Sequence, residues 1–395
     1  MRIVPKGFKS FFPLGFLALS IASYSTAFDL EQSVSSVIES DLWQDIDIDV
    51  RLNLDTSGFD GIYREDLSNN NAYDSLVRRA RLSLKAPIYK NWSSKLQLAI
   101  NEGDDTYETK DFYLRYNGFE FADIRIGQSK EPFGLENMTS SANLAYTERS
   151  LSPFSLGRST GINISDSKRN FSWSIGAYKV EENDKVKADG NKAYTTRITF
   201  SPLRKGKNYN HLGLAYSKRN LEGADYEIKS NAGVDTAFNF LDTINISTDT
   251  IEKSGIELAW GRGALSLQGE YQHLQINAME ITKNASYQAF YTQLSYFLTD
   301  DHRPYRKGRF SSVKPNSTKG SVELTLRKGE LQSVHIGSEN INPDITIATT
   351  VLGINYYLNK RINLMLNASD TESSGIVNEG QDSGSALTFR AQIRL

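Results

Sequence analysis

The sequence contains no cysteine in its 395 residues, which excludes disulfide bridges, thiolate metal sites and thiol catalysis. Histidine is almost as scarce, with 4 residues, so we expect no metal and no other cofactor. No run of residues approaches the roughly 18 apolar positions of a membrane-spanning helix. Charges of the two signs nearly balance, with 45 basic and 47 acidic side chains, and no basic patch interleaved with aromatics indicates nucleic-acid binding.

The N-terminal region has the three parts of a secretory signal. Basic residues at the start precede the apolar run 11–22, and Ser25, Thr26 and Ala27 supply the small residues that signal peptidase reads. We therefore expect a signal peptide at 1–27. Residues 28–45 are expected to form a short N-terminal segment. The apolar spacing within it fits either an amphipathic helix or a terminal stretch without fixed structure.

From residue 46 onward the apolar residues recur with a period of two. Ile46, Ile48, Val50, Leu52 and Leu54 alternate with Asp47, Asp49, Arg51 and Asn53. Successive side chains of a strand point to opposite faces, so one face is apolar and the other charged. The pattern returns about 16 times up to a last strand ending at Leu395, which is typical of an outer-membrane barrel. A soluble sandwich would not carry charge on the second face of strand after strand.

Turn signals separate these strands. Residues 358–361 form a tight turn, whereas 218–253 and 300–318 are predicted to be long polar inserts. Short turns on one rim and long loops on the other are typical of such barrels. The sequence therefore predicts an all-β, 16-stranded antiparallel transmembrane β-barrel over residues 46–395.

Several segments resemble one family, the phosphate-selective porins O and P. The segments are Arg78-Arg79-Ala80-Arg81-Leu82, Asp111-Phe112-Tyr113-Leu114-Arg115-Tyr116, Gly127-Gln128-Ser129-Lys130-Glu131-Pro132-Phe133-Gly134-Leu135-Glu136, Thr139-Ser140-Ser141, Glu148-Arg149-Ser150, Ser295-Tyr296-Phe297-Leu298-Thr299, Arg303-Pro304-Tyr305, Val313-Lys314-Pro315 and Phe389-Arg390-Ala391-Gln392. They are spread over most of residues 46–395, and the stretch 127–150 is long and specific.

The resemblance implies an architecture and a setting. It implies a 16-stranded barrel, assembled as a homotrimer in the outer membrane of a Gram-negative bacterium, with basic side chains along its channel. It also implies a third external loop that folds inward and narrows the pore, here the roughly 30 residues between Gly127 and Ser159. The expected partners are small inorganic anions, phosphate above all, and the surrounding outer-membrane lipids and lipopolysaccharide.

Candidate pore-lining residues come from two sources. Strand alternation directs a set of basic and acidic side chains to the lumen, and the basic ones outnumber the acidic ones. The resemblance places two arginines and a lysine near the constriction, two serines as hydrogen-bond donors to the anion, and one aspartate on the wall beside them. The combined candidates for pore lining and anion binding are Arg51, Arg78, Arg79, Arg81, Lys95, Asp111, Arg115, Lys130, Ser140 and Ser141. Strict alternation would turn Arg78 to the lipid, so its place in the lumen requires a bulge or a strand end.

One position departs from the family. Phosphate-specific members carry a lysine two residues before Thr139, where this chain has Asn137. Losing that charge should weaken anion binding and blur the selectivity for phosphate. Lys130 and Arg149 could supply the missing charge. Alternatively they could anchor the loop through salt bridges to Glu131 or Glu148.

The pattern predicts a pore for passive diffusion of small anions, phosphate or related oxyanions, and not an enzyme. A weakly selective porin is the first alternative, because of Asn137. A barrel hydrolase needs a serine nucleophile with a nearby histidine, and no Gly-x-Ser-x-Gly elbow occurs. A barrel adhesin that binds a partner through its long inserts is the remaining alternative.

Overall fold

A computed structural model describes residues 46–65, 73–100, 107–180, 191–243, 245–338, 344–375 and 381–395. The predicted signal peptide (1–27) and the segment 28–45 lie outside these residues. The wall consists of β1 (Asp47–Phe59), β2 (Tyr73–Tyr89), β3 (Trp92–Ile100), β4 (Tyr107–Tyr116), β5 (Asp123–Lys130), β6 (Arg158–Lys168), β7 (Phe171–Lys179), β8 (Lys192–Phe200), β10 (Asn208–Tyr226), β13 (Ile246–Arg262), β14 (Leu265–Ala278), β15 (Ala285–Phe297), β18 (Ser321–Ile336), β19 (Thr346–Tyr357), β20 (Ile362–Ser374) and β21 (Ser383–Arg394).

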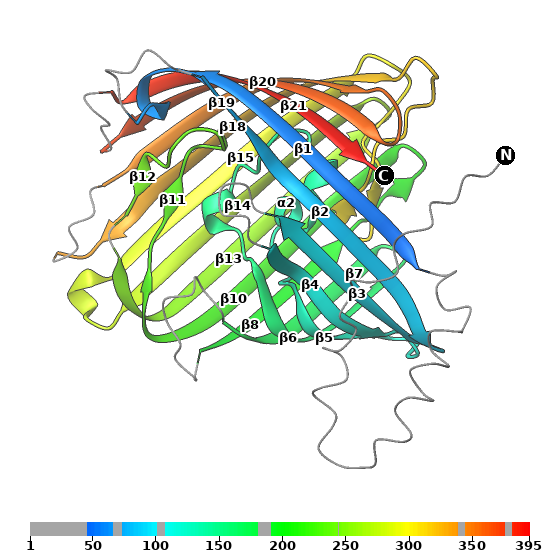
Figure 1. Ribbon diagram of the computed structural model, residues 1–395. Coiled ribbons are helices and arrows are strands. Elements are labelled where there is room, and N and C mark those ends of the chain that lie inside the picture. The colour runs from blue at the N-terminus through cyan, green and yellow to red at the C-terminus, as the bar shows by residue number, and fades with distance from the viewer. Residues whose placement is uncertain are drawn as a thin grey trace, which may run out of the picture. The chain divides into compact units, whose positions relative to one another are not determined.

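These 16 wall strands form one closed antiparallel ring (Figure 1). Each strand pairs with the next along the chain, and β1 also pairs with β21, with Arg51 opposite Arg394. Closure leaves no unpaired strand edge, which is the condition for a sheet to exist in lipid. The predicted 16-stranded antiparallel barrel is therefore confirmed.

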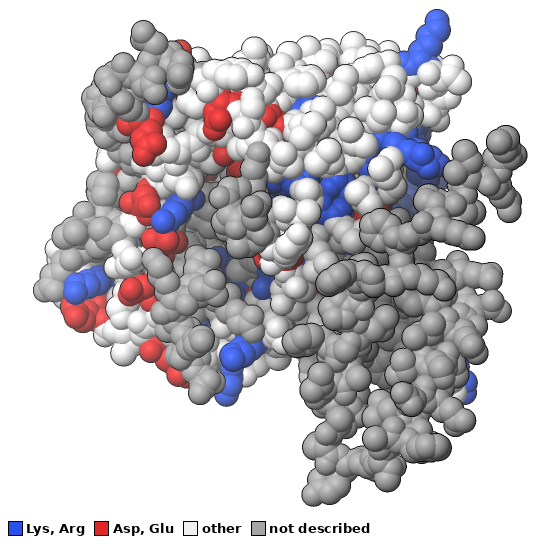
Figure 2. Space-filling model, in the orientation of Figure 1, with Lys and Arg blue, Asp and Glu red and all other residues white. Residues whose placement is uncertain are grey.

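The two faces of the wall differ as the alternation predicts. Ile48 and Leu214 are 59% and 62% exposed on the outer face, whereas Arg390 and Glu323 are fully buried on the inner face. On the face shown in Figure 2 the upper part of the wall carries few charges, and the acidic residues gather toward one rim. Within the described residues no helix is long and apolar enough to cross a membrane.

A bulge in β2 decides where its arginines point. Asn53 of β1 lies opposite Arg79, but Asp55 lies opposite Leu76, so Val77 and Arg78 together oppose a single residue. An extra residue of this kind shifts the alternation by one. Arg78 and Arg79 can therefore both reach the lumen, as the resemblance requires.

The two rims do not divide short and long connections as cleanly as the sequence predicts. The insert 298–320 leaves β15 at the rim of the short turns, where Phe297 bonds to Ala264 of the tight turn 263–264. It carries the short strands β16 (Tyr305–Arg306) and β17 (Arg309–Phe310). We call 298–320 the inner hairpin, because the contacts described below join it to the inner face of the wall.

The second predicted insert, 218–253, was too long. β10 runs on to Tyr226 and β13 begins at Ile246, so the connection spans only 227–245 and holds β11 (Lys229–Ser230) and β12 (Leu241–Asp242). Both strands extend beyond the apolar band, where neither face needs to be apolar. The hydrophobic alternation therefore fades before the backbone pairing does.

An apolar cluster inside the ring was not predicted. Inward side chains of β13, β14 and β15, such as Ile251, Leu274 and Tyr287, are buried against Val234 and Phe240 of the connection 227–245. The inner face of the wall is therefore apolar, and not polar, at this place. An inward-packed connection needs an apolar surface to lie on, and the wall supplies it at the long-connection end.

Candidate functional site

The segment 131–157 between β5 and β6, here named the inner loop, is bonded to the inner face of the wall. It is the third connection at the long-connection rim and includes α2 (Leu135–Met138), which Figure 1 shows within the ring of strands. Glu270 of β14 accepts hydrogen bonds from the backbone N–H groups of Leu135 and Glu136, at 2.8 and 2.6 Å. Glu131, at the start of the loop, pairs with Arg219 of β10 at 3.0 Å.

Three arginines converge on one carboxylate of the inner loop, Glu148. Arg79 binds it with both terminal nitrogens at 2.8 Å, Arg78 at 3.1 Å and Arg390 at 2.8 Å. Burial alone would raise the pKa of Glu148, but the charges of Arg79, Arg78 and Arg390 hold it well below its usual range. Its carboxylate stays ionised as the pH falls through the usual carboxyl range, so the contact persists in mild acid.

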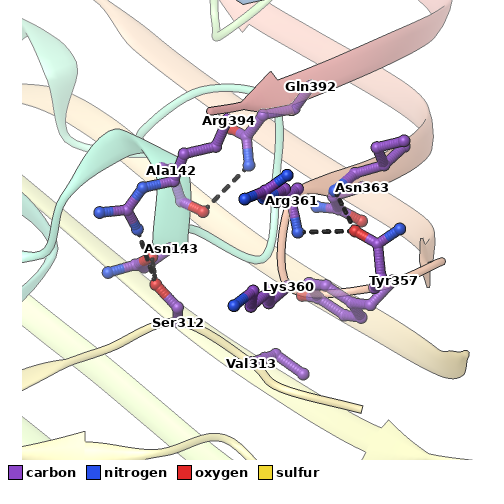
Figure 3. Close-up of a pocket in the computed structure, with 12 residues that line it drawn as sticks. Ala142, Asn143, Ser312, Val313, Tyr357, Lys360, Arg361, Asn363, Gln392 and Arg394 are labelled. Carbon is purple, nitrogen blue, oxygen red and sulfur yellow. Dashed lines mark hydrogen bonds between the residues drawn. The ribbon is translucent and has the colours of Figure 1, made fainter. Parts of the chain in front are cut away.

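The inner hairpin is held by a second buried ion pair. Arg303 binds Glu323 of β18 through two nitrogens, each at 2.6 Å, and donates to the Asn143 carbonyl of the inner loop at 2.8 Å. Further along, Ser312 donates to the Asn143 side chain at 2.9 Å and accepts from Arg394 at 3.2 Å (Figure 3). The hairpin, the inner loop and β21 therefore form one connected layer.

Releasing the inner hairpin should widen the pore. We expect Arg303→Met combined with Glu323→Met to raise single-channel conductance in planar bilayers. The double variant removes the hairpin's anchor without leaving one buried charge unpaired, so the barrel should still fold. Lys319→Gln, on the exposed end of the same insert, is the matched control and should leave conductance unchanged. Equal conductance of the double variant and the parent would contradict the role given to this pair.

Beside the inner loop lies a group of cations that we name the Arg81 cluster: Arg51, Arg81, Lys95, Lys130 and Arg158, with Asp111 as its carboxylate. Lys130 belongs to it as the cross-strand partner of Arg158. Asp111 pairs with Lys95 and, at 2.5 Å, with Arg158. Arg51 donates to the Ser141 hydroxyl at 3.1 Å and lies 3.8 Å from Asp49.

Arg81 itself has no carboxylate partner among the described residues. The charges that act on it most strongly are those of other arginines, Arg79, Arg158 and Arg51. Its Nε is buried and makes no hydrogen bond. A guanidinium in this position lacks the anion that usually accompanies a partly buried charge.

Lys130 reaches the position where the family lysine is missing. Its ammonium donates to the backbone carbonyl of Asn137 at 2.7 Å, while the Asn137 side chain turns away to donate to the Leu156 carbonyl at 3.0 Å. Arg149 donates to the carbonyls of Glu136 and Thr139. Neither cation forms the expected salt bridge with Glu131 or Glu148. Both hold the inner loop through its backbone carbonyls instead.

A cavity of about 400 Å³ opens at the short-turn end of the lumen. Arg115, Arg125, Lys307 and Arg309 line it; Lys307 and Arg309 belong to the inner hairpin. Arg115 pairs with Asp123 at 2.5 Å, whereas the guanidinium of Arg125 lies over the ring of Tyr113. The cationic lining of the lumen therefore continues from the Arg81 cluster to this end of the barrel.

The structure separates the predicted site residues into groups. Arg51, Arg81, Lys95, Asp111 and Lys130 come together in the Arg81 cluster, with Ser141 bonded to Arg51. Three others have partners outside it. Arg79 pairs with Glu148, Arg78 pairs with Glu148 and Asp235, and Arg115 lines the cavity at the short-turn end. Ser140 is half-buried, and its hydroxyl does not cap the turn that follows.

Sequence reasoning missed Arg158 and Arg309. Arg158 is the first residue of β6, where the alternation does not yet decide which way a side chain points. Its position directly after the inner loop was the available signal. Arg309 enters the lumen only because the inner hairpin does.

A closed antiparallel ring with an apolar outer wall and a charged lumen partly filled by its own connections defines an outer-membrane porin. Such a protein is a channel and not an enzyme. Residues 46–395 match the family described as phosphate-selective porin O and P, and the chain belongs to that family.

The relatives agree with this assignment. Porin O of Pseudomonas aeruginosa is 24% identical over 384 residues, covering 87% of this chain and 86% of that protein. Among solved structures, a loop-deletion mutant of OmpT from Vibrio cholerae matches with a TM-score of 0.59 at 10% identity, over 89% of this chain and 99% of its own. An anion-selective porin from Comamonas acidovorans matches with a TM-score of 0.56 at 13% identity, over 89% and 99% of the two chains. These similarities confirm the fold, and the family places the protein in the outer membrane of Gram-negative bacteria.

Proposed function

We propose that this porin conducts small inorganic anions by passive diffusion and prefers phosphate or related oxyanions. The observation that carries the proposal is Arg81, a partly buried guanidinium surrounded by other cations and without a carboxylate partner in the described part of the chain. A passing anion would supply the missing charge. The known relatives support the proposal, since Porin O belongs to the same family and a porin of the same fold is described as anion-selective.

The Arg81 cluster fits a transient oxyanion site. It sets five cationic side chains against the carboxylate of Asp111, so the net charge is positive while Asp111 limits how tightly an anion is held. Selective conduction needs this compromise, because an anion bound too tightly does not leave. Hydroxyls at Ser140 and Ser141 would donate to a phosphate oxygen from the inner loop.

Reversal-potential measurements in planar bilayers test the proposal. With a potassium chloride gradient across the membrane, we expect a potential of the sign given by anion preference. Adding phosphate, and separately sulfate, should then reduce the chloride conductance. Cation preference would contradict the pore assignment. Absence of block by either oxyanion would favour a weakly selective porin.

Replacing Lys130 tests whether it substitutes for the lysine absent at position 137. We expect Lys130→Met to raise the phosphate concentration that halves the chloride current by about tenfold, the effect of losing one charge-assisted hydrogen bond. Lys314→Met, at an exposed position of the inner hairpin, is the control and should change nothing. An unchanged phosphate block in Lys130→Met would remove Lys130 from the site.

The assembly is a further part of the proposal. We propose a homotrimer, as the family resemblance implies. The mass of the detergent-solubilised protein, measured by light scattering after subtraction of the detergent, tests this directly. A mass equal to one chain would contradict it.

A further inference from the structure

The outer face of β7, β8 and β10 changes character toward the long-connection rim. Apolar side chains such as Ile175, Ile198 and Leu214 point outward along most of each strand. Next come two exposed tyrosines, Tyr194 and Tyr216. Aromatic residues of this kind mark the level of the lipid headgroups in outer-membrane barrels.

Beyond the tyrosines the outward side chains are lysines. Lys179 of β7 and Lys192 of β8 are direct cross-strand partners, and both are exposed. Lys218 of β10 lies opposite Tyr194 and is exposed as well. Lys179 and Lys192 lie two residues, or roughly 7 Å along the strands, beyond the level of Tyr194.

The cross-strand lysines have no counter-charge in the described part of the chain. Neither Lys179 nor Lys192 forms an ion pair there, whereas Lys218 pairs with Glu252 at 3.0 Å. Like charges directly opposite each other on one face of a sheet are destabilising. An anion that bridges the two ammonium groups would therefore stabilise this pair.

Other parts of the outer wall carry the opposite sign at this end. On β20 the outward side chains beyond the apolar band are Asp370 and Glu372. Lys328 of β18 also points outward and is exposed, but its cross-strand partners are Thr292 and Thr350. The directly opposed lysines therefore distinguish β7 and β8, on a rim where acidic residues are frequent (Figure 2). A partner that binds these opposed lysines must be anionic and must lie at the membrane surface.

We propose that Lys179 and Lys192, with Lys218 beside them, bind the phosphate groups of lipid A, the phosphorylated glycolipid of the outer leaflet. The long-connection rim of an outer-membrane barrel faces that leaflet. The lysines lie at the height of the headgroup phosphates, and the apolar residues below them, Ile175 and Ile198, offer a surface to the acyl chains. The site is independent of the pore, because these side chains point away from the lumen.

Free phosphate is a poor occupant of this surface. Lys179 and Lys192 are exposed, so water and dissolved salt would compete with an isolated phosphate ion for their ammonium groups. A lipid phosphate is already held at the membrane surface by its acyl chains. The two sources share one chemistry, but only the lipid adds apolar contact to the charge interaction.

Native mass spectrometry of the detergent-solubilised protein tests the site, with bisphosphorylated lipid A as the probe. We expect K179Q/K192Q to bind lipid A about tenfold more weakly than the parent, since each basic residue near a charged membrane surface contributes several-fold. The control K205Q/K319Q removes the same charge at the short-turn rim and should bind as the parent does. Heat-modified gel mobility of each variant checks that the barrel is folded.

Two further probes give the remaining outcomes. Lipid A without phosphates should bind the parent as weakly as it binds K179Q/K192Q, and millimolar inorganic phosphate should displace little of the bound lipid A. Equal binding of the two double variants, or equal binding of phosphorylated and dephosphorylated lipid A, would overturn the proposal. Displacement by inorganic phosphate at low concentration would show a site for free phosphate instead. None of these outcomes depends on the selectivity of the pore.

Discussion

Replacing Arg81 with glutamine is expected to abolish most of the pore's preference for anions. The variant should shift the reversal potential in a salt gradient toward the cation side and raise the half-blocking phosphate concentration by about tenfold or more. The reason is that two cations of the cluster, Arg81 and Lys130, pair with no described carboxylate, and Lys130 is already bonded to the Asn137 carbonyl whereas Arg81 is not held in this way. Its full charge is therefore available to an ion in transit.

Two comparisons make the Arg81 experiment decisive. Arg81→Lys keeps the charge and should retain the reversal potential while losing part of the phosphate block, because an ammonium lacks the planar fork of a guanidinium. Arg115→Gln removes an arginine already paired with Asp123 and should have a smaller effect. If Arg81→Gln and Arg115→Gln shifted the selectivity equally, the total charge of the lumen would matter and the unpaired arginine would not.

The second large effect is expected from Glu148→Gln, as a loss of stability. The substitution leaves Arg78, Arg79 and Arg390 around a neutral side chain, and removing one partner from a buried ion pair typically costs about 3–5 kcal/mol. Asp55, which also binds Arg390, and Asp235, which also pairs with Arg78, offset part of this. We expect a lower urea midpoint for unfolding from lipid vesicles and a noisier single-channel current as the inner loop detaches.

Glu252→Gln provides the control for Glu148→Gln. It breaks the exposed pair with Lys218 on the outer wall, and an exposed pair contributes about 1 kcal/mol or less. Its urea midpoint and its current should match those of the parent. A Glu148→Gln barrel as stable and as quiet as Glu252→Gln would mean that the inner loop is held by its other contacts, such as those of Glu270 and Glu131.

The sequence predicts the barrel well because the decisive information is local. In β1 odd-numbered and even-numbered residues point to opposite faces of the wall. The same alternation gives the direction of Arg51 and Arg390 without any knowledge of their neighbours. The strand count and the antiparallel order follow from repeating this reading. This alternation does not predict the direction of Arg78, because the bulge that turns Arg78 inward is a property of the pairing between β1 and β2.

The candidate site was harder to predict, because its members meet only through inward-folded connections. Glu148 lies 242 positions from Arg390 in the chain, and no local pattern joins them. The direction in which the inner hairpin folds, and hence the place of Arg309, depends on the contact of Arg303 with Glu323 at the start of β18. Composition and periodicity carry no information about such pairings.

The seam between β1 and β21 has a consequence for biogenesis. Asp49 and Arg394 join across it although 345 positions separate them in the chain. The ring cannot close until both partners are available, and pairings so distant in sequence form slowly. Until then both edge strands present open rows of backbone donors and acceptors, which other chains can capture. The nascent polypeptide should accordingly depend on holding chaperones during transit, and a damaged seam should yield aggregates and not a smaller pore.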